Sequence, residues 1–440
     1  MYEGERIGRN MNNFKTTREY ALKLDKQDPL RIFRNRFYLL TGKIYMDGNS
    51  LVLLSKDAET SLLKLLHQWK NLGINDWLQG DPSWFYYAEK LGARMSNLVG
   101  AKPEEVIITS STTLNLHSLA GSFYQPTGKR TKILADELNF PSDIYALNSH
   151  IRLKGMNPEE NMVLIKSKDG RFLKETDIIE RMSEEIALII LPSVLYRSGQ
   201  LLDMKLLSRE ANKKGILIGF DCSHSVGALP HYFDDWGVDF AFWCHYKYMN
   251  NGPGGVAGIY VNKKHFDLPV TLAGWWGYRK NKQFDMFLTF EKAETAGGWQ
   301  TGTPHLLSMA PLEGSLKIFE EAGINNVRKK SLQLTGYMID LLCQEGLTAK
   351  PYNYQVGSPI EEKSRGGHVA VEHVEAARIN KALKERKGII PDFRYPNIIR
   401  FAPIALYNTF EEVWQVVQAL KEIIDNEDYK KYDKTNDSVT

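Results

Sequence analysis

Two charged residues follow apolar runs at positions where side chains of a sheet often carry out chemistry. Asp221 comes directly after the run GILIGF, and Lys247 stands among aromatic residues in WCHYKYMNNGPGG. An aspartate at the end of a strand is about as often a helix N-cap as a functional group. A lysine in such surroundings is rarer, because removing an ammonium group from water is costly unless the group is paired or used. A lysine of this kind can form a Schiff base with an aldehyde.

The spacing of these two residues places them on neighbouring strands. Asp221 precedes Lys247 by 26 positions, which is the length of one strand–helix–strand step. Both side chains can therefore face one crevice. An amine that holds an aldehyde carbon, with a carboxylate that keeps a ring nitrogen protonated, suits pyridoxal phosphate, which we expect as the cofactor.

A phosphate group also needs a binding site. The segment SSTTLNLHSLAG, residues 110–121, places hydroxyl residues that include Thr112 and Thr113 between an apolar run and a helical pattern. An ordinary helix cap is the plain interpretation of such a segment. Its place at a strand end beside the other two features favours a phosphate site built from hydroxyls and free backbone N–H groups.

The elements that must position these residues alternate between short apolar runs and amphipathic stretches. Helical spacing is clear in 177–185 and 201–214. This alternation predicts an α/β fold with a mostly parallel sheet of the seven-stranded type, wrapped by helices, with ligands at the carboxyl ends of the strands. The strand candidates are EEVIITSS, TKILADELNF, ALIILPS, GILIGFDCSHS, VDFAFWCHYK and GGVAGIYV.

The pattern of predicted helices and strands changes after about Pro304. Longer helical patterns over 310–322 and 325–345 precede the strand candidates HVAVEH and NIIRFAP, which predicts a smaller α+β domain. The expected division has four parts: 1–71, an N-terminal arm with helices that pack on the small domain; 72–305, the large cofactor-binding domain; 306–428, the C-terminal small domain; and 429–440, a frayed tail.

Composition excludes several classes of protein. Hydrophobic residues make up 43% of the 440 residues and charged residues 25%, as in ordinary folded proteins. The net charge of +3 gives no sign of a nucleic-acid partner. The N-terminus has no apolar signal segment and no window is long enough for a membrane span, so we expect neither export nor insertion.

Cysteine and histidine usage indicates neither a disulfide framework nor a metal site. Three cysteines without a CxxC pair favour a reducing cytoplasm. His117, His245 and His305 lack metal-ligand spacing and are interpreted as structural or surface imidazoles, so no metal is expected.

Several longer motifs resemble the kynureninase family of pyridoxal-phosphate enzymes. They are YMDGNSL at 45–51, NFPSD at 139–143, FDCSH at 220–224, WGVDFA at 236–241, YKY at 246–248, GWWG at 274–277 and IRFAP at 399–403. The resemblance implies the aspartate-aminotransferase-like fold. It also implies hydrolysis of L-kynurenine to anthranilate and L-alanine in tryptophan catabolism, with the 3-hydroxylated substrate as a second possibility.

The resemblance also assigns roles to residues. Lys247 would bind the cofactor aldehyde, Asp221 with His224 would pair with the ring nitrogen, and Tyr246 would touch the phosphate and assist proton transfer. Cofactor contacts are further implied for Thr112, Thr113, Phe140, Ser142, Asp143, Trp275 and Thr303. Because Trp275 and Thr303 match positions that reach the neighbouring subunit's phosphate, the resemblance implies a homodimer with shared sites.

The substrate side is implied in the same way. Arg400 matches the arginine that clamps the α-carboxylate, for which its bidentate fork is suited. Asn49, Ser50, Trp77 and Gly302 complete the implied substrate contacts. The pair Gly302-Thr303 looks like that of bacterial enzymes that favour L-kynurenine, whereas animal enzymes carry Ser-Asn. Val52 stands where the family usually has glycine, which puts the shape of that turn in question.

Two other functions stay open from the sequence. A cysteine desulfurase or selenocysteine lyase shares the fold and cofactor but needs a nucleophilic cysteine on an exposed loop, which Cys222, Cys244 and Cys343 do not offer. A non-catalytic scaffold of the same fold would have no physical need to retain Asp221, Lys247 and Arg400 together.

Overall fold

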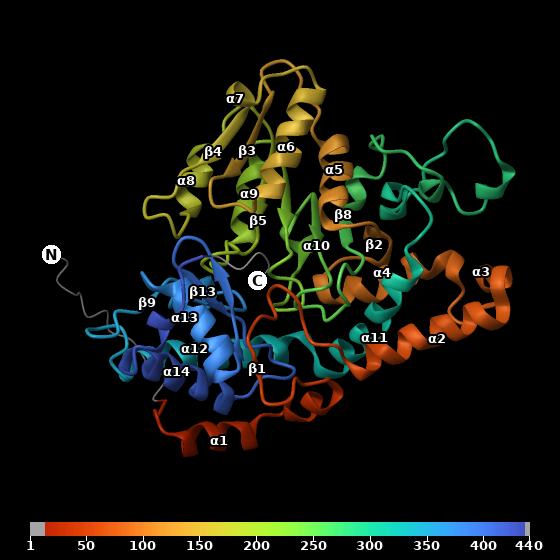
Figure 1. The fold of residues 1–440 in the computed structure, drawn as a ribbon. Helices are drawn as coiled ribbons and strands as arrows, with labels where there is room; N and C mark the ends of the chain where they lie inside the picture. The colour runs from red at the N-terminus through yellow and green to blue at the C-terminus, as the bar shows by residue number, and fades with distance from the viewer. Residues whose placement is uncertain (1–13, 436–440) are drawn as a thin grey trace.

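The computed structural model describes residues 14–435, and residues 1–13 and 436–440 lie outside the described part. Figure 1 shows two lobes: a large sheet with helices on its faces, and a smaller lobe built mainly from the C-terminal residues drawn in blue. The elements α2, α3 and α4 extend along the side of the large lobe.

The large lobe is organised around a seven-stranded sheet. Its strand order is β2-β8-β7-β6-β5-β3-β4, and β8 runs in the direction opposite to that of the other six strands. The strands are β2 (Val106–Ile108), β3 (Lys132–Asp136), β4 (Met162–Ile165), β5 (Ile186–Pro192), β6 (Leu217–Asp221), β7 (Phe240–Trp243) and β8 (Gly258–Val261). The mostly parallel sheet expected from the sequence is therefore confirmed. All six apolar runs become strands, and the seventh strand is the half-exposed edge strand β4.

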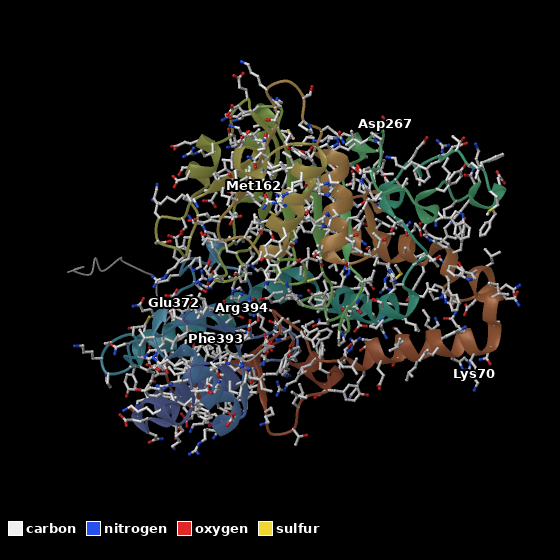
Figure 2. All side chains as sticks on the ribbon, turned by 45° about the horizontal axis from the view of Figure 1, so that its top comes forward. Lys70, Met162, Asp267, Glu372, Phe393 and Arg394 are labelled. Atoms are coloured by element: carbon white, nitrogen blue, oxygen red, sulfur yellow. The ribbon has the colours of Figure 1, made fainter. Side chains whose placement is uncertain are left out.

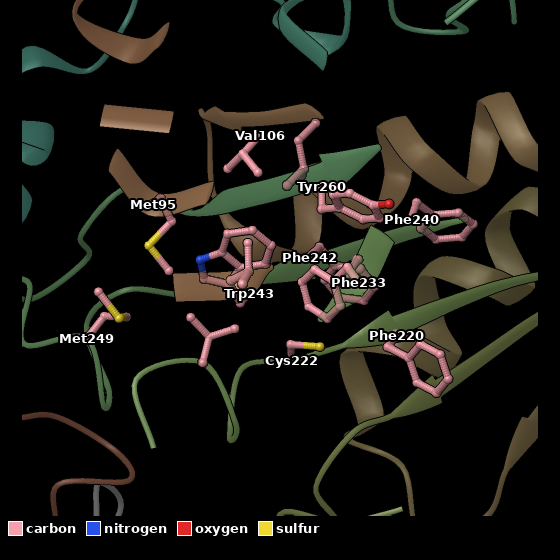
Figure 3. Close-up of a cluster of buried hydrophobic side chains, with 14 of the residues drawn as sticks. Met95, Val106, Phe220, Cys222, Phe233, Phe240, Phe242, Trp243, Met249 and Tyr260 are labelled. Carbon is pink, nitrogen blue, oxygen red and sulfur yellow. The ribbon is translucent and has the colours of Figure 1, made fainter. Parts of the chain in front are cut away.

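Helices cover both faces of this sheet, which explains why its strands are almost entirely apolar. They are α5 (Thr112–Phe123), α6 (Pro141–Leu153), α7 (Pro158–Asn161), α8 (Glu175–Glu180), α9 (Met204–Lys213) and α10 (Phe233–Trp236). Figure 3 shows one part of the resulting core, where Phe220, Phe242 and Trp243 of adjacent strands lie with Phe233 of α10.

The smaller lobe contains a four-stranded antiparallel sheet of order β12-β13-β10-β9. These strands are β9 (Gln355–Val356), β10 (Val369–Glu372), β12 (Asp392–Arg394) and β13 (Ile398–Phe401). A short parallel pair joins β1 (Ile44–Tyr45) to β11 (Ile389–Ile390). The helices α12 (Ile324–Gln344), α13 (Ala376–Ala382) and α14 (Phe410–Asp425) supply the second apolar core.

The N-terminal segment divides between the two lobes. Helix α1 (Arg18–Gln27) lies on α14, where the carboxylate of Asp25 accepts hydrogen bonds from the first two backbone N–H groups of that helix. Helix α2 (Lys56–Leu72) lies along α11 (Leu306–Ala322), and Gly314 permits this approach because a Cβ there would meet the backbone of Asp57. The helices α3 (Asp76–Gln79) and α4 (Tyr87–Val99) follow.

The packing differs from the expected division in three places. Residues 1–71 were expected to pack on the small domain, but α2 lies on α11 of the large lobe. Helix α11 contributes its buried side chains to the core of the large lobe, so the boundary expected at 305/306 cuts through that core. The second core instead takes its first α12 side chain at Leu334. The described part of the expected tail also packs, since Tyr429 and Tyr432 lie against the second core. Residues 436–440 of that tail lie outside the described residues.

Candidate active site

The carboxyl ends of β6 and β7 position the two residues singled out first. These strands are parallel neighbours, with Asp221 paired to Phe242, and the chain reaches Lys247 four residues after β7 ends. Asp221 is buried and Lys247 is half-buried. The Nζ atom of Lys247 lies 3.2 Å from Nε2 of His224. The expected juxtaposition of amine and carboxylate at one sheet edge is therefore present.

Two buried carboxyl groups face this amine. Asp143, in the first turn of α6, is 2% exposed. Burial and the neighbouring charge of Asp221 raise the pKa of Asp143 well above its usual value. Burial also raises the pKa of Asp221, and the charge of Lys247 opposes that rise. A further cationic partner in the crevice would favour the ionised form of both carboxyl groups.

Several polar atoms at this sheet edge are buried without a hydrogen-bond partner among the described residues. They include Asp143 Oδ2, Ser223 Oγ and His224 Nδ1. Burial lowers the pKa of His224 well below its usual value, and the charges of Lys247 and Arg400 act in the same direction, so the imidazole is neutral. Unpartnered buried polar atoms are uncommon in folded proteins and indicate a missing polar ligand here.

The N-terminus of α5 offers an anion site at the same edge. Thr112 and Thr113 are its first two residues, and the side chain of the N-cap residue Ser111 makes no capping bond. The preceding Ser110 turns the chain with a positive φ of 50°. The first backbone N–H groups of this helix are therefore available to a phosphate, with two threonine hydroxyls beside them.

An aromatic platform stands at the N-terminus of the next helix. Phe140 is the N-cap residue of α6 and is 46% exposed, and its ring meets Tyr196 edge-on at 5.4 Å. Ser142, in the first turn of α6, donates to Asp143. Tyr246 is half-buried next to the lysine, whose Nζ lies 5.8 Å from the centre of its ring. These side chains suit a planar aromatic cofactor, so the residues present fit pyridoxal phosphate.

The expected substrate arginine lies in the smaller lobe and reaches the same region. Arg400 on β13 is 1% exposed, and its Nη1 donates to the carbonyl oxygen of Tyr196 at 2.7 Å. Tyr196 thus connects Phe140 with Arg400. Ser50 lies 3.2 Å from Nη2 of the arginine, and Asn49 is fully buried, with no partner for its amide group among residues 14–435. Burial lowers the pKa of Arg400 to about 10, so the guanidinium stays charged at neutral pH.

The turn that carries Ser50 accommodates its unusual valine. Val52 lies outside the left-handed region of backbone space and its N–H donates to the carbonyl oxygen of Tyr246. A glycine is therefore not required at this position, and the turn is tied directly to the lysine segment.

Three other expected residues lie together in a separate hollow. Trp77 of α3, Trp275 and Thr303 line a cavity of about 450 Å³ with an aromatic wall. Gly302 is exposed beside Thr303. Within the described residues, the lining of this hollow includes none of Lys247, Asp221 and Arg400. Within the described chain, the hollow and the crevice that contains Lys247 therefore have different linings.

Sequence reasoning missed several residues at the site. Tyr196 follows the end of β5, so the rule that ligands bind at strand ends could have indicated it. Tyr248 and His368 lie around His224, with ring centres 6.5 and 6.0 Å away, and His368 has no described partner for either ring nitrogen. His368 comes from the smaller lobe, and no local pattern connects it to the crevice.

The cysteines and His245 have other environments. Cys222 and Cys244 are buried, and burial raises the pKa of Cys222 to about 12, while Cys343 is exposed on α12. Figure 3 shows the sulfur of Cys222 among the core side chains. His245 bridges Trp243 and a backbone carbonyl oxygen, as a structural imidazole does.

The described residues contain neither a metal-binding cluster nor a helix that could cross a membrane. No group of three or more His, Cys, Asp or Glu side chains among residues 14–435 could hold a metal ion. In the same part of the chain, no helix combines the length and apolar character needed to span a membrane.

Solved structures with this fold include a cysteine desulfurase and an enzyme that holds pyridoxal phosphate. A cysteine desulfurase from Thermococcus onnurineus superimposes with a TM-score of 0.73 at 17% identity, over 90% of this chain and 98% of that one. The enzyme C-DES, with glycine covalently linked to its pyridoxal phosphate, gives 0.75 at 16% identity, over 88% and 98%. At this identity the likeness shows the fold alone. Fold and crevice together define the class, an enzyme that uses pyridoxal phosphate.

Relatives in sequence give a narrower result. The kynureninase of Geobacillus thermodenitrificans is 59% identical over 98% of this chain and 100% of its own length. That of Bacillus cereus is 58% identical over 97% of this chain and 99% of its own. The kynureninase C-terminal domain family also matches residues 327–420. The chain belongs to the kynureninase family, as its motifs indicated, and its cofactor is pyridoxal phosphate.

Proposed function

We propose that the chain hydrolyses L-kynurenine to anthranilate and L-alanine, as a step of tryptophan catabolism. The observation that carries this proposal is 59% identity to a kynureninase over 98% of the chain. The charged side chains at the sheet edge supply groups that this reaction needs.

The residues at the sheet edge have distinct roles toward the cofactor. Lys247 would bind its aldehyde, Asp221 would pair with its ring nitrogen, and His224 would support that carboxylate. The phosphate would lie at the N-terminus of α5 beside Thr112 and Thr113, whose helix has no side-chain cap of its own. Phe140, Ser142, Asp143 and Tyr246 would complete the contacts from this chain.

Proton transfer depends on the lysine. Pyridoxal phosphate, when bound, supplies an acceptor for the electron pair released as the substrate's Cβ–Cγ bond breaks. The Nζ atom of Lys247 would take the proton from the substrate's Cα, and Tyr246 would assist its transfer. The neutral His224, 3.2 Å from Nζ, can accept a hydrogen bond from the ammonium form of the lysine.

Substrate orientation depends on the smaller lobe. Arg400 would hold the α-carboxylate, with Asn49 and Ser50 at its side, since its fork matches a planar carboxylate. The clamp comes from β13 and the lysine from the end of β7, so the substrate would be held between the two lobes.

The aromatic hollow supports a homodimer with shared sites. Trp275 and Thr303 would complete the partner's phosphate site, while Trp77 and Gly302 would contact the partner's substrate ring. The hollow is separate from Lys247 within one described chain, which is the arrangement that a shared site requires. We further propose a cytoplasmic location, which agrees with two buried thiols, Cys222 and Cys244.

Cysteine desulfurases share the fold of this chain, and their activity is therefore the competing function. That chemistry requires a reactive thiol at the site, but burial raises the pKa of Cys222 and of Cys244. Cys343 is exposed, but it lies on α12, a helix of the smaller core, and not on a loop at the crevice.

A product assay distinguishes the two functions. Purified holoenzyme is given L-kynurenine and, separately, L-cysteine, with anthranilate followed by fluorescence and sulfide by a colorimetric assay. We expect anthranilate and alanine in equal amounts and no sulfide. Sulfide from cysteine without anthranilate from kynurenine would overturn the proposal.

A further inference from the structure

A buried carboxylate stands directly across the sheet from the substrate arginine. Asp392 on β12 is the cross-strand partner of Arg400 on β13 in the antiparallel ladder. Both residues are almost completely buried, with 0% and 1% of their side chains exposed, and the carboxylate Oδ2 pairs with the guanidinium Nη2. Because the ladder sets the register, this contact is built into the sheet.

Other protein groups engage the remaining edges of the arginine. Nη1 donates to the carbonyl oxygen of Tyr196 at 2.7 Å, and Nη2 donates to Ser50 Oγ at 3.2 Å. Ser50 in turn donates to Asp392 at 3.3 Å. Only Nε of Arg400 has no described partner. The orientation of the guanidinium is therefore set by the protein before any substrate arrives.

Asp392 also contacts a second arginine. Nη2 of Arg394 lies 3.3 Å from the same Oδ2 atom. Figure 2 shows Arg394 on the side of the smaller lobe that faces the large lobe. One carboxylate thus lies between two guanidinium groups.

We propose that Asp392 is a positioning residue for the substrate's carboxylate, acting by holding the fork of Arg400 in its binding orientation. This inference rests on the proposed role of Arg400 as the carboxylate clamp. The proposal predicts that removing the charge of Asp392 weakens the binding of carboxylates, although Asp392 itself does not touch the ligand.

A competing role would have the opposite effect. If Asp392 occupied Arg400 in place of substrate and left when substrate bound, its removal would strengthen carboxylate binding. The structure favours positioning, because the carboxylate of Asp392 also contacts Arg394 and Ser50 and would lose both contacts if it moved away from Arg400.

The test compares two ligands that differ only in the carboxylate. Binding of L-alanine and of L-alaninamide to the holoenzyme is measured by calorimetry for wild type and for Asp392→Asn. We expect the variant to lose roughly tenfold in affinity for alanine and to bind alaninamide unchanged. The KM for L-kynurenine should rise by a similar factor, while kcat should stay within roughly threefold.

Glu372→Gln is the matched control. Glu372 lies on β10 of the same sheet, is 8% exposed and forms an ion pair with Arg171 at 2.6 Å, outside the site. This variant should lower the melting temperature and leave the alanine-to-alaninamide affinity ratio unchanged. If Asp392→Asn leaves this ratio at the wild-type value, or raises it, the inference is wrong.

Two further measurements separate this inference from folding defects and from the proposed function. Asp392→Glu keeps the charge and should bind alanine better than Asp392→Asn; equal loss in both variants would contradict the inference. The alanine titration needs no kynurenine turnover. A wild-type enzyme that prefers alanine to alaninamide but does not cleave kynurenine would overturn the proposed function and leave this inference standing.

Discussion

The Nζ atom of Lys247 lies 3.2 Å from Nε2 of His224, a residue that follows the neighbouring strand. This contact joins the ends of β6 and β7 and places the lysine beside the buried carboxylate of Asp221. Because the imidazole is held neutral by burial, it can accept a hydrogen bond without adding positive charge to the crevice.

Asp221→Asn should keep the fold and reduce kynurenine hydrolysis. The amide has the same shape but cannot balance a protonated ring nitrogen, so we expect a loss of roughly 10²-fold or more in kcat, with weaker cofactor binding. Asp239→Asn is the matched control, because Asp239 is also buried but pairs with Lys264 and His265 away from the crevice. Asp239→Asn should lower the melting temperature and reduce kcat much less than Asp221→Asn does. Similar kcat values for the two variants would contradict the role of Asp221.

Mixed dimers test whether sites are shared between subunits. Lys247→Ala and Trp275→Ala change different partial sites, so co-expression should restore activity by forming one intact site in each mixed dimer. With random pairing this gives about a quarter of wild-type activity, if each parent is inactive. A mixture of Lys247→Ala and Asp221→Asn serves as the control and should restore nothing. No recovery with the first pair would mean that Trp275 serves its own chain.

Substrate preference should respond to the pair at 302 and 303. A Cβ built at Gly302 meets no heavy atom within 4 Å, so a serine fits there without strain from neighbours. Gly302→Ser with Thr303→Asn should raise the kcat/KM ratio of 3-hydroxykynurenine to kynurenine by roughly tenfold. Gly302→Ala, which lacks the hydroxyl, should leave the ratio near the wild-type value. The same ratio in all three proteins would remove these residues from substrate selection.

The stability of the large lobe should fall in acid because of His245. Its Nε2 accepts from Trp243 at 2.8 Å, so Nδ1 carries the hydrogen and donates to Val256, and burial lowers its pKa to about 4. The unfolded chain has the ordinary pKa near 6.5 and binds this proton first. The contribution of this histidine is therefore complete above about pH 6.5 and is lost as the pH falls toward 4.

Melting temperatures of wild type and His245→Gln measure this effect. The variant should be less stable at pH 7.5 by about 1–3 kcal/mol, because buried hydrogen bonds are lost. It should then lose less further stability than wild type between pH 7.5 and 4.5. Parallel pH profiles for the two proteins would contradict this role.

Much of the fold was predictable because its signals are local. Runs such as GILIGF and FAFW are buried on both faces, so their composition alone indicates parallel strands. The edge strand β4 gives a weaker signal, because three of its four residues are only partly buried. The boundary near 305 was placed too early because α11 is apolar on the side that joins the large core, which periodicity cannot assign to a partner.

The site was predictable where chemistry follows a strand end, as at Asp221 and Lys247. The resemblance to the family added Arg400, and it added Trp275 and Thr303, which line the aromatic hollow. No local pattern marks these three residues. Asp392 and His368 were missed because their importance arises only from contacts with residues distant in the sequence. From the sequence alone, an aspartate buried in a strand cannot be distinguished from an aspartate in a turn or at the edge of a sheet.

The most direct test of the account locates the cofactor on the chain. Holoenzyme is reduced with borohydride, digested, and its pyridoxyl-bearing peptide is identified by mass spectrometry, with Lys247→Ala and the exposed-lysine variant Lys168→Ala treated alike. We predict one labelled site, Lys247, in wild type and in Lys168→Ala, no label in Lys247→Ala, and a loss of roughly 10²–10⁴-fold or more in kynurenine hydrolysis by that variant. A label on another lysine, or full hydrolysis by Lys247→Ala, would contradict the account.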